Sequence, residues 1–256
     1  MIRKIKDKLK TYIIIRKIRN IIKKIEVNII LSKLKLNEKE LVSNLCDRGL
    51  TYLSEKKLVN ILNTCKKINE TNLSGIFIEA GCALGGSSIL ISKMKTLKRP
   101  FYIYDVFGMI PSPTEQDTYD VHKRYKTIVE GKSTGLKGNK YYGYEEGLYK
   151  LVKSNLLDFD IDCKKESVML IKGLVQDTMK INEPVAFAHI DVDWYEPVKT
   201  CLEQIFPNLV VGGSLILDDY HDWGGCRKAT DEFLRKVVGQ FSMEDSYGSV
   251  KITRIH

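Results

Sequence analysis

The stretch that decides the fold is GIFIEAGCALGGSSILISKMKTL, residues 75–97. It opens with a short apolar run that ends at Gly81, and its residues from 88 onward predict a helix. The loop between them also contains Gly85 and Gly86. These glycines let the backbone approach a ligand closely, and the helix after the loop offers free N–H groups. A strand, a glycine loop and a helix in this order predict one unit of an α/β sheet, with a binding site at the end of the strand.

The same alternation of strands and helices continues along the chain. Further strands are predicted at 100–107, 167–177, 185–193, 214–220 and 249–255. Helices are predicted at 54–68, with Ser54 as N-cap, at 196–209, where Gly212 and Gly213 follow, and at 224–238. Because most of the strands are apolar on both faces, we expect an α/β fold with a mostly parallel sheet and helices on both faces.

The positive charge of the chain is confined to its beginning. Residues 1–40 contain thirteen Lys/Arg and four Asp/Glu, which accounts for the whole net charge of +9. The rest of the chain is neutral, so we expect no general nucleic-acid-binding face. Apolar residues recur at helical spacing in this segment, in two series: Ile2, Ile5, Leu9 and Tyr12, then Ile14, Ile18, Ile21, Ile25 and Ile29.

We therefore expect two parts, a basic amphipathic helical segment over 1–45 with N-terminal helices and a catalytic domain over 46–256. Three roles stay open for the segment: an oligomer contact, a lid over the active site, or contact of residues 1–40 with an anionic membrane surface. A homo-oligomer is the favoured expectation. No apolar run reaches the about 20 residues of a membrane-spanning helix, and no secretion signal is recognisable, so a cytoplasmic enzyme, at most membrane-peripheral, is expected.

Two predicted strands end in acidic residues. Asp191 lies near the end of the strand at 185–193, in HIDVDWYEP. Asp218 and Asp219 lie near the end of the next strand, at 214–220, in GGSLILDDYHDW. Neighbouring parallel strands lie about 4.8 Å apart, so these carboxylates can converge on one point. Carboxylate oxygens completed by water describe a Mg²⁺ site, in which substrate hydroxyls can replace the waters. Asp193, just before a predicted helix, is expected to be a solvent-facing N-cap instead.

The glycine loop and Asp105 indicate the second ligand. The loop is not G-x-G-x-x-G, and no G-K-[ST] follows it, which argues against a dinucleotide or a P-loop nucleotide. Asp105 ends the second strand, where an acid accepts hydrogen bonds from a ribose. An adenosine-bearing ligand without phosphates fits both features, and S-adenosylmethionine meets that description.

These residues resemble the macrocin O-methyltransferase family, class I enzymes that methylate sugar hydroxyls with S-adenosylmethionine and Mg²⁺. The resemblance runs from about Gly49 to Val238 and is carried by GLTYLSEKKLVNIL, FIEAGCALGGSS and the long block at 188–233. It implies a Rossmann-like class I methyltransferase fold. It also implies a cofactor site and a metal site: Glu79, Gly81, Gly85, Ser87, Asp105 and Asp177 for the cofactor, and Asp191, Asp218 and Asp219 for the metal.

The catalytic base is expected to be a histidine near the acidic pairs. His221 lies two residues beyond Asp219 and is the first candidate, and His122 is the second. Asp191 is expected to be catalytic through the metal. His189 lies within an apolar strand and is expected to be a hydrogen-bonded core residue.

The acceptor is expected to be a sugar, and three readings stay open. Residues 109–140 are too long for an ordinary connection and predict a lid. Its basic residues, Lys123, Arg124, Lys126, Lys132 and Lys137, would suit a diphosphate. These basic residues, together with a chain composition rich in Ile, Lys and Asn, favour a nucleotide-linked hexose or heptose as the acceptor. Such a sugar would be destined for capsular or lipopolysaccharide polysaccharide. The alternative is a sugar on a glycosylated natural product such as an antibiotic. A glycosyltransferase using the D-x-D at 191–193 is the weakest reading, because it leaves the glycine loop unexplained.

Overall fold

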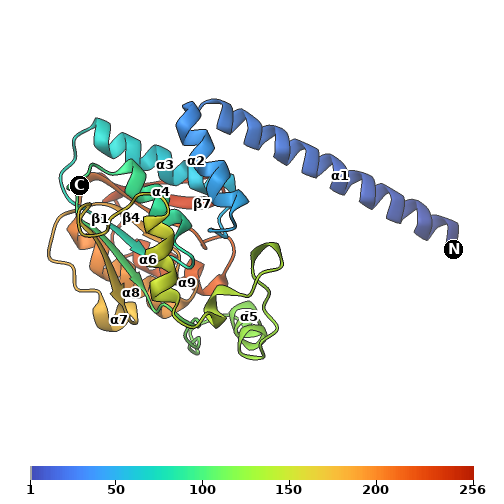
Figure 1. The fold of residues 1–256 in the computed structure, drawn as a ribbon. Coiled ribbons are helices and arrows are strands. Elements are labelled where there is room, and N and C mark those ends of the chain that lie inside the picture. Colours follow the sequence, from blue (N-terminus) through green and yellow to red (C-terminus); the bar gives the residue numbers. More distant parts are fainter. Residues whose placement is uncertain (1) are drawn as a thin grey trace.

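The computed structural model describes residues 2–256, with the side chains of 12, 14–22 and 24–256. Seven strands form one sheet (Figure 1). In chain order they are β1 (Ile76–Ala80), β2 (Phe101–Asp105), β3 (Val168–Lys172), β4 (Val185–Ile190), β5 (Leu209–Leu217), β6 (Phe241–Ser246) and β7 (Ser249–Arg254). Their order across the sheet is β3-β2-β1-β4-β5-β7-β6. The first five are parallel, whereas β7 runs antiparallel to β5 and β6 antiparallel to β7.

Helices cover both faces of the sheet. One face carries α2 (Leu36–Asp47), α3 (Glu55–Glu70), α4 (Gly86–Met94) and α6 (Leu148–Leu157), and the other carries α7 (Val175–Thr178), α8 (Tyr195–Ile205) and α9 (Gly224–Leu234). Alternation along the strands divides the core in two. Phe77 and Phe187 pack under the first group, while Ile78 and Ala188 pack under the second. The predicted α/β sheet with helices on both faces is confirmed.

The N-terminal segment forms two helices that pack differently. α1 (Ile2–Ser32) leaves the body of the molecule as a long rod, and only its end near α2 and α3 touches the core (Figure 1). α2 begins four residues later and buries Val42 and Leu45 in the core shared with α3 and α4. The expected 1–45 segment therefore divides between the two helices, because α2 belongs to the body. Among the described residues, no helix is long and apolar enough to cross a membrane.

Several elements differ from the sequence prediction, among them α6, which was not predicted. Helix α8 stops at Ile205, a short turn η3 (Phe206–Asn208) follows, and β5 already begins at Leu209, so Gly212 and Gly213 lie inside the strand. A side chain at Gly213 would meet the Val210 carbonyl oxygen at 2.8 Å, and the pairing with β4 shifts register here, which explains the glycines. β6 was not predicted because it is an edge strand with mostly exposed, polar residues. The expected strand at 167–177 ends at Lys172, and α7 follows it.

The predicted lid has structure of its own. It contains α5 (Tyr119–Val129) and the short turn η1 (Leu136–Gly138), and a second short turn, η2 (Tyr142–Tyr144), follows just after it. Its first part is tied to the body, because the indole N–H of Trp194 donates to the Pro111 carbonyl oxygen at 2.9 Å and the Gly224 N–H donates to Asp120 at 3.2 Å. The segment lies over the ends of the parallel strands, where an α/β sheet binds its ligands.

Candidate functional site

Two cavities open at the carboxyl ends of the parallel strands, where the strand order reverses between β1 and β4. The first cavity, of about 100 Å³, extends toward the ends of β2 and β3 and includes Tyr104 and residues 173–176. The second cavity, of about 430 Å³, extends toward α3 and the lid and includes Lys57, Arg124 and Trp223. They share a wall that contains Gly81, Asp105, Tyr142, Asp191, Asp193 and Trp194. Two ligands held in these cavities would therefore meet across this wall.

Gly81 brings the glycine loop against the end of β4. Its φ is +84°, and a Cβ on it would lie 1.8 Å from the Asp191 carbonyl oxygen, so only glycine fits. Asp105 holds the same loop from the other side. Its carboxylate accepts the backbone N–H groups of Cys82 at 2.8 Å, Ala83 at 3.3 Å and Phe107 at 2.6 Å. Burial raises the pKa of Asp105, and these hydrogen bonds partly oppose that rise. Both residues line both cavities, and their contact with a cofactor stays a prediction.

Four other predicted cofactor residues lie outside both cavities. Glu79 is fully buried, and its carboxylate binds the Ser88 hydroxyl and lies 3.0 Å from Nδ1 of His189. Gly85 faces Val152, and Ser87 is buried in α4. Asp177 is exposed on α7, whereas its neighbour Gln176 lines the first cavity. Glu79, Gly85 and Ser87 therefore lie behind or within the loop, Asp177 lies on the surface, and none of the four lines either cavity. His189 is the hydrogen-bonded core histidine that was expected.

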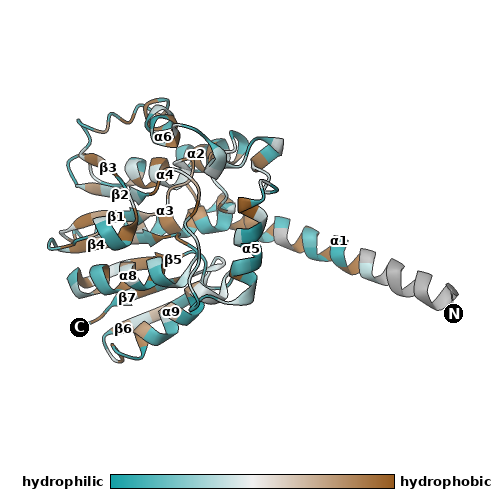
Figure 2. Cartoon of the chain, turned by 90° about the horizontal axis from the view of Figure 1, so that it is seen from below, coloured by the Kyte–Doolittle hydropathy of each residue, from teal (hydrophilic) through white to brown (hydrophobic). Residues whose placement is uncertain are grey.

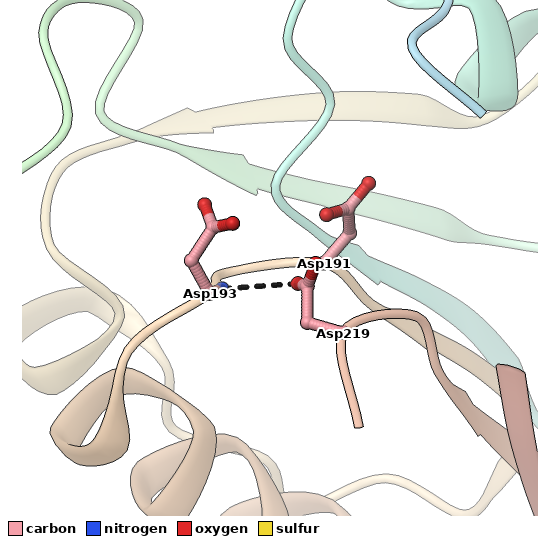
Figure 3. A group of neighbouring side chains, drawn as sticks. All are labelled: Asp191, Asp193 and Asp219. Atoms are coloured by element: carbon pink, nitrogen blue, oxygen red, sulfur yellow. Dashed lines mark hydrogen bonds between the residues drawn. The ribbon is translucent and has the colours of Figure 1, made fainter. Parts of the chain in front are cut away.

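Three carboxylates converge at the shared wall. Oxygens of Asp191, Asp193 and Asp219 lie within 4.8 Å of one another, and the Asp193 N–H donates to the Asp219 carboxylate at 3.2 Å (Figure 3). Burial raises the pKa of all three, and repulsion from neighbouring carboxylates adds to the rise; for Asp193 the pKa reaches about 6. A group of this kind favours a bound cation, because a cation removes both the burial cost and the repulsion.

Asp193 belongs to an acidic group, whereas the sequence predicted a solvent-facing N-cap. The N-cap role expected of Asp193 is filled by Asp117 of the lid, which accepts the Tyr195 N–H at 2.8 Å. Asp193 itself has a φ of +58°, and one of its carboxylate oxygens lies within 4.8 Å of oxygens of Asp191 and Asp219. Asp218 binds Lys57 through Oδ2, whereas its buried Oδ1 has no hydrogen-bond partner among the described residues. Asp218 also forms a second acidic group with Asp219 and Asp222, so the trio of Asp191, Asp218 and Asp219 stays a prediction.

Lys57 is a site residue that sequence reasoning missed. It comes from α3, and its ammonium lies 2.8 Å from the Asp218 carboxylate, 3.1 Å from the Asp218 carbonyl oxygen and 2.9 Å from the Asp222 carboxylate. Burial alone would lower the pKa of Lys57, but the ion pairs with Asp218 and Asp222 outweigh it and raise the pKa. Lys57 is therefore a fixed positive charge that neutralises the acids next to the three-carboxylate group.

We expect the Lys57→Met variant to unfold at lower urea concentration, with a loss of about 1–3 kcal/mol, because the buried Asp218 carboxylate loses its partner. Adding Asp218→Asn should restore part of the loss, since it removes the unpaired charge. Lys56→Met is the matched control, because Lys56 pairs with Glu26 at the surface and should cost less than about 1 kcal/mol. Equal urea midpoints for Lys57→Met and the parent protein would show that the ion pair has no structural role.

Neither predicted histidine base reaches the cavities. Nε2 of His221 lies 3.0 Å from the Asp245 carboxylate of β6, and His122 is exposed on α5. Neither is among the residues that line the first or the second cavity. The turn after Asp219 carries His221 away from the wall, which its distance of two residues in the sequence did not reveal.

Aromatic side chains and one arginine close the second cavity. Tyr52, Tyr141, Tyr142 and Trp223 line it together with Trp194. Of the five basic lid residues named from the sequence, only Arg124 lines the cavity. Lys126 and Lys132 pair with Glu130, and Lys137 binds the Asp47 carbonyl oxygen. The lid therefore brings a single cation to the site rather than a cluster.

Comparisons with known proteins agree with this architecture. Residues 5–245 match the macrocin-O-methyltransferase (TylF) family. The chain is 27% identical over 192 residues to demethyldecarbamoylnovobiocin O-methyltransferase of Streptomyces niveus, covering 73% of this chain and 68% of the relative. The structure of the O-methyltransferase NovP superposes with a TM-score of 0.68 at 24% identity, covering 81% of this chain and 83% of that one. The calicheamicin methyltransferase CalS11 superposes with a TM-score of 0.58 at 18% identity, covering 89% and 90%.

The family match spans nearly the whole chain, including the glycine loop, Asp105 and all of the acids at the ends of β4 and β5. The superpositions on NovP and CalS11 show that the chain shares their fold. The chain therefore belongs to the macrocin-O-methyltransferase (TylF) family and is an O-methyltransferase.

Proposed function

We propose that this protein transfers the methyl group of S-adenosylmethionine to a sugar hydroxyl of a glycosylated natural product, in a reaction that depends on Mg²⁺. The observation that carries the proposal is the shared wall: two cavities of different character meet at Asp191 and Asp193. Methyl transfer needs such a junction, because donor and acceptor must be held in line with the reacting atoms in contact.

The first cavity suits the methyl donor. It begins at Gly81 and Asp105, which are the loop and strand end that hold an adenosine-bearing ligand in sheets of this kind. Its far side is formed by residues 173–176, with Gln176 able to hydrogen-bond a polar group. A sulfonium placed near the shared wall would also be attracted by the carboxylates there.

The carboxylate group fits a divalent metal ion of the hard, oxygen-binding type. Asp191, Asp193 and Asp219 can each offer one oxygen within 4.8 Å of the others, which is the donor set that Mg²⁺ prefers. When bound, Mg²⁺ would lower the pKa of the acceptor hydroxyl and fix its oxygen in place. Asp218 is a further candidate, because Lys57 binds its Oδ2 while its buried Oδ1 has no partner among the described residues.

The chain's own residues orient the acceptor and take its proton. The described lining of the second cavity contains carboxylates, tyrosines, an arginine and a lysine but no histidine. We therefore assign the proton to a carboxylate of this cavity rather than to His221 or His122. The lid covers the junction, and the Trp194 side chain anchored on Pro111 helps to exclude water from it.

The second cavity suits a sugar attached to a larger molecule. Its aromatic residues offer flat apolar faces for the C–H side of a sugar ring, and its carboxylates offer acceptors for the hydroxyls. The name of the relative, a demethyldecarbamoylnovobiocin O-methyltransferase, supports a natural product as the carrier. A nucleotide-linked hexose or heptose is the second candidate, favoured by Arg124 alone, since the lid lysines lie outside the cavity.

A panel of acceptors separates the two candidates. The same sugar would be offered as a desmethyl natural-product glycoside, as a nucleoside diphosphate derivative and in free form, and transfer of labelled methyl from S-adenosylmethionine would be measured with Mg²⁺. We expect the glycoside to be methylated most efficiently and Arg124→Gln to change its kcat/KM by less than about tenfold. Methylation of the nucleotide-linked sugar alone, abolished by Arg124→Gln, would replace the first candidate by the second.

A further inference from the structure

The long helix α1 carries an exposed apolar surface. Seven isoleucines on it are each between 45% and 57% exposed. At 3.6 residues per turn they fall within an arc of about 120° along one side of the helix. We call this surface the isoleucine stripe, which consists of Ile14, Ile15, Ile18, Ile21, Ile22, Ile25 and Ile29. A contiguous apolar surface of this kind on a protruding helix marks an interaction site.

The body of the protein does not cover this stripe. Where α1 meets the body, the contacts are made by Leu31, Val27 and Ile30, which point to the side of the helix opposite the stripe. The ion pair between Glu26 and Lys56 of α3 fixes the helix in this orientation. Figure 1 shows α1 extending beyond the body as a rod, and in Figure 2 the coloured part of this helix carries both brown and teal residues. A lid role for the stripe over the active site is therefore not supported.

The charge around the stripe selects its partner. Residues 1–32 contain ten Lys/Arg and two acids, Asp7 and Glu26. In the described part, Arg16, Lys17, Arg19 and Lys24 lie off the stripe, and none of them forms an ion pair with another described residue. Two copies joined through the stripe would leave these four charges without acidic partners. An anionic surface would instead compensate them.

We propose that α1 lies in the plane of an anionic lipid surface, with the isoleucine stripe in the acyl boundary and the basic residues at the headgroups. Between residues 14 and 29, α1 combines this apolar stripe with basic residues that lie off it, as interfacial helices do, and no described helix could cross the bilayer. Bound in this way, the helix would hold the catalytic body at the membrane surface through the short link to α2. This inference does not depend on the identity of the acceptor.

Sedimentation of the full-length protein with vesicles tests the proposal. We expect binding to vesicles that contain phosphatidylglycerol, little binding to vesicles of phosphatidylcholine alone, and release at high salt. Ile18→Gln with Ile22→Gln should weaken binding by at least about tenfold, because two apolar side chains are lost from the buried face. Neutralising Arg16, Lys17, Arg19 and Lys24 to Gln should have a similar effect. Asn20→Gln, which changes neither the stripe nor the charge, is the matched control.

Two results would overturn the proposal. One is vesicle binding that is independent of the stripe or of lipid charge: the Ile18→Gln, Ile22→Gln variant binds like the parent protein, or the parent protein binds both kinds of vesicle equally. The other is a wild-type dimer in light scattering that this variant dissociates, without vesicle binding by either protein, since the occupant would then be a second copy. Methyl transfer to a soluble acceptor should be the same in all of these variants, which separates failure of this proposal from failure of the proposed function.

Discussion

Asp191→Asn and Asp219→Asn should each lose methyl transfer by at least about a thousandfold, the scale expected when charge stabilisation at a metal-assisted reaction is lost. Both carboxylates belong to the group at the shared wall of the two cavities. Burial and mutual repulsion already raise their pKa values, so removal of one carboxylate reduces the electrostatic repulsion within the group. Each variant should therefore unfold at the same temperature as the parent protein or slightly higher.

Kinetics and thermal unfolding, measured on the same preparations, check both halves of this expectation. Asp162→Asn is the matched control, because Asp162 precedes β3 at the amino ends of the strands and its side chain is 44% exposed. It should keep full activity. Excess chelator should inactivate the parent protein, and Mg²⁺ should restore it. Full activity of Asp191→Asn, or a parent protein that is indifferent to chelator, would remove the metal from the account.

Gly81→Ala should destabilise the protein by about 3 kcal/mol or more, the combined effect of an overpacked site and a side chain at positive φ. The added Cβ would lie 1.8 Å from the Asp191 carbonyl oxygen, which is backbone and cannot turn aside. Either the glycine loop or the end of β4 must move, and the shared wall moves with it. Methyl transfer should fall even in protein that remains folded.

The destabilisation caused by the steric clash of the added Cβ can be separated from that caused by the positive φ. Gly131 has a φ of +70° and no atom within 4 Å of an added Cβ, so Gly131→Ala should cost only about 1 kcal/mol. Urea unfolding of the two variants measures the difference. If Gly81→Ala costs no more than Gly131→Ala, the close approach of the loop to β4 is not a feature of the folded protein.

The sheet and the converging acids were predictable because both follow from local patterns. Apolar runs with glycine loops define the parallel strands, and the neighbouring positions of β4 and β5 bring Asp191 and Asp219 together. The family resemblance added the activity, which the family match confirms. The edge strand β6 was not predicted, because its mostly polar and exposed residues show no alternation of apolar and polar positions.

The finer site was not predictable, because it depends on contacts between distant segments. Lys57 reaches Asp218 across 161 positions of sequence, and Asp117 reaches the start of α8 across 78. The second contact releases Asp193 from the capping role that local pattern gave it. The left-handed turn at Asp193, with a φ of +58°, then directs its carboxylate into the group. In the same way, the turn after Asp219 directs His221 to Asp245 and away from the wall.

The central claim, that a metal site and a cofactor site meet at one wall, is tested most directly by anomalous diffraction from crystals grown with Mn²⁺ and S-adenosylhomocysteine. Mn²⁺ binds the same oxygen ligands as Mg²⁺ and gives a measurable anomalous signal. We predict one strong peak in contact with Asp191, Asp193 and Asp219, and the nucleoside in the first cavity beside Gly81 and Asp105. A peak at Asp218 and Asp222 with Lys57 displaced, or a nucleoside bound away from Gly81, would contradict the account.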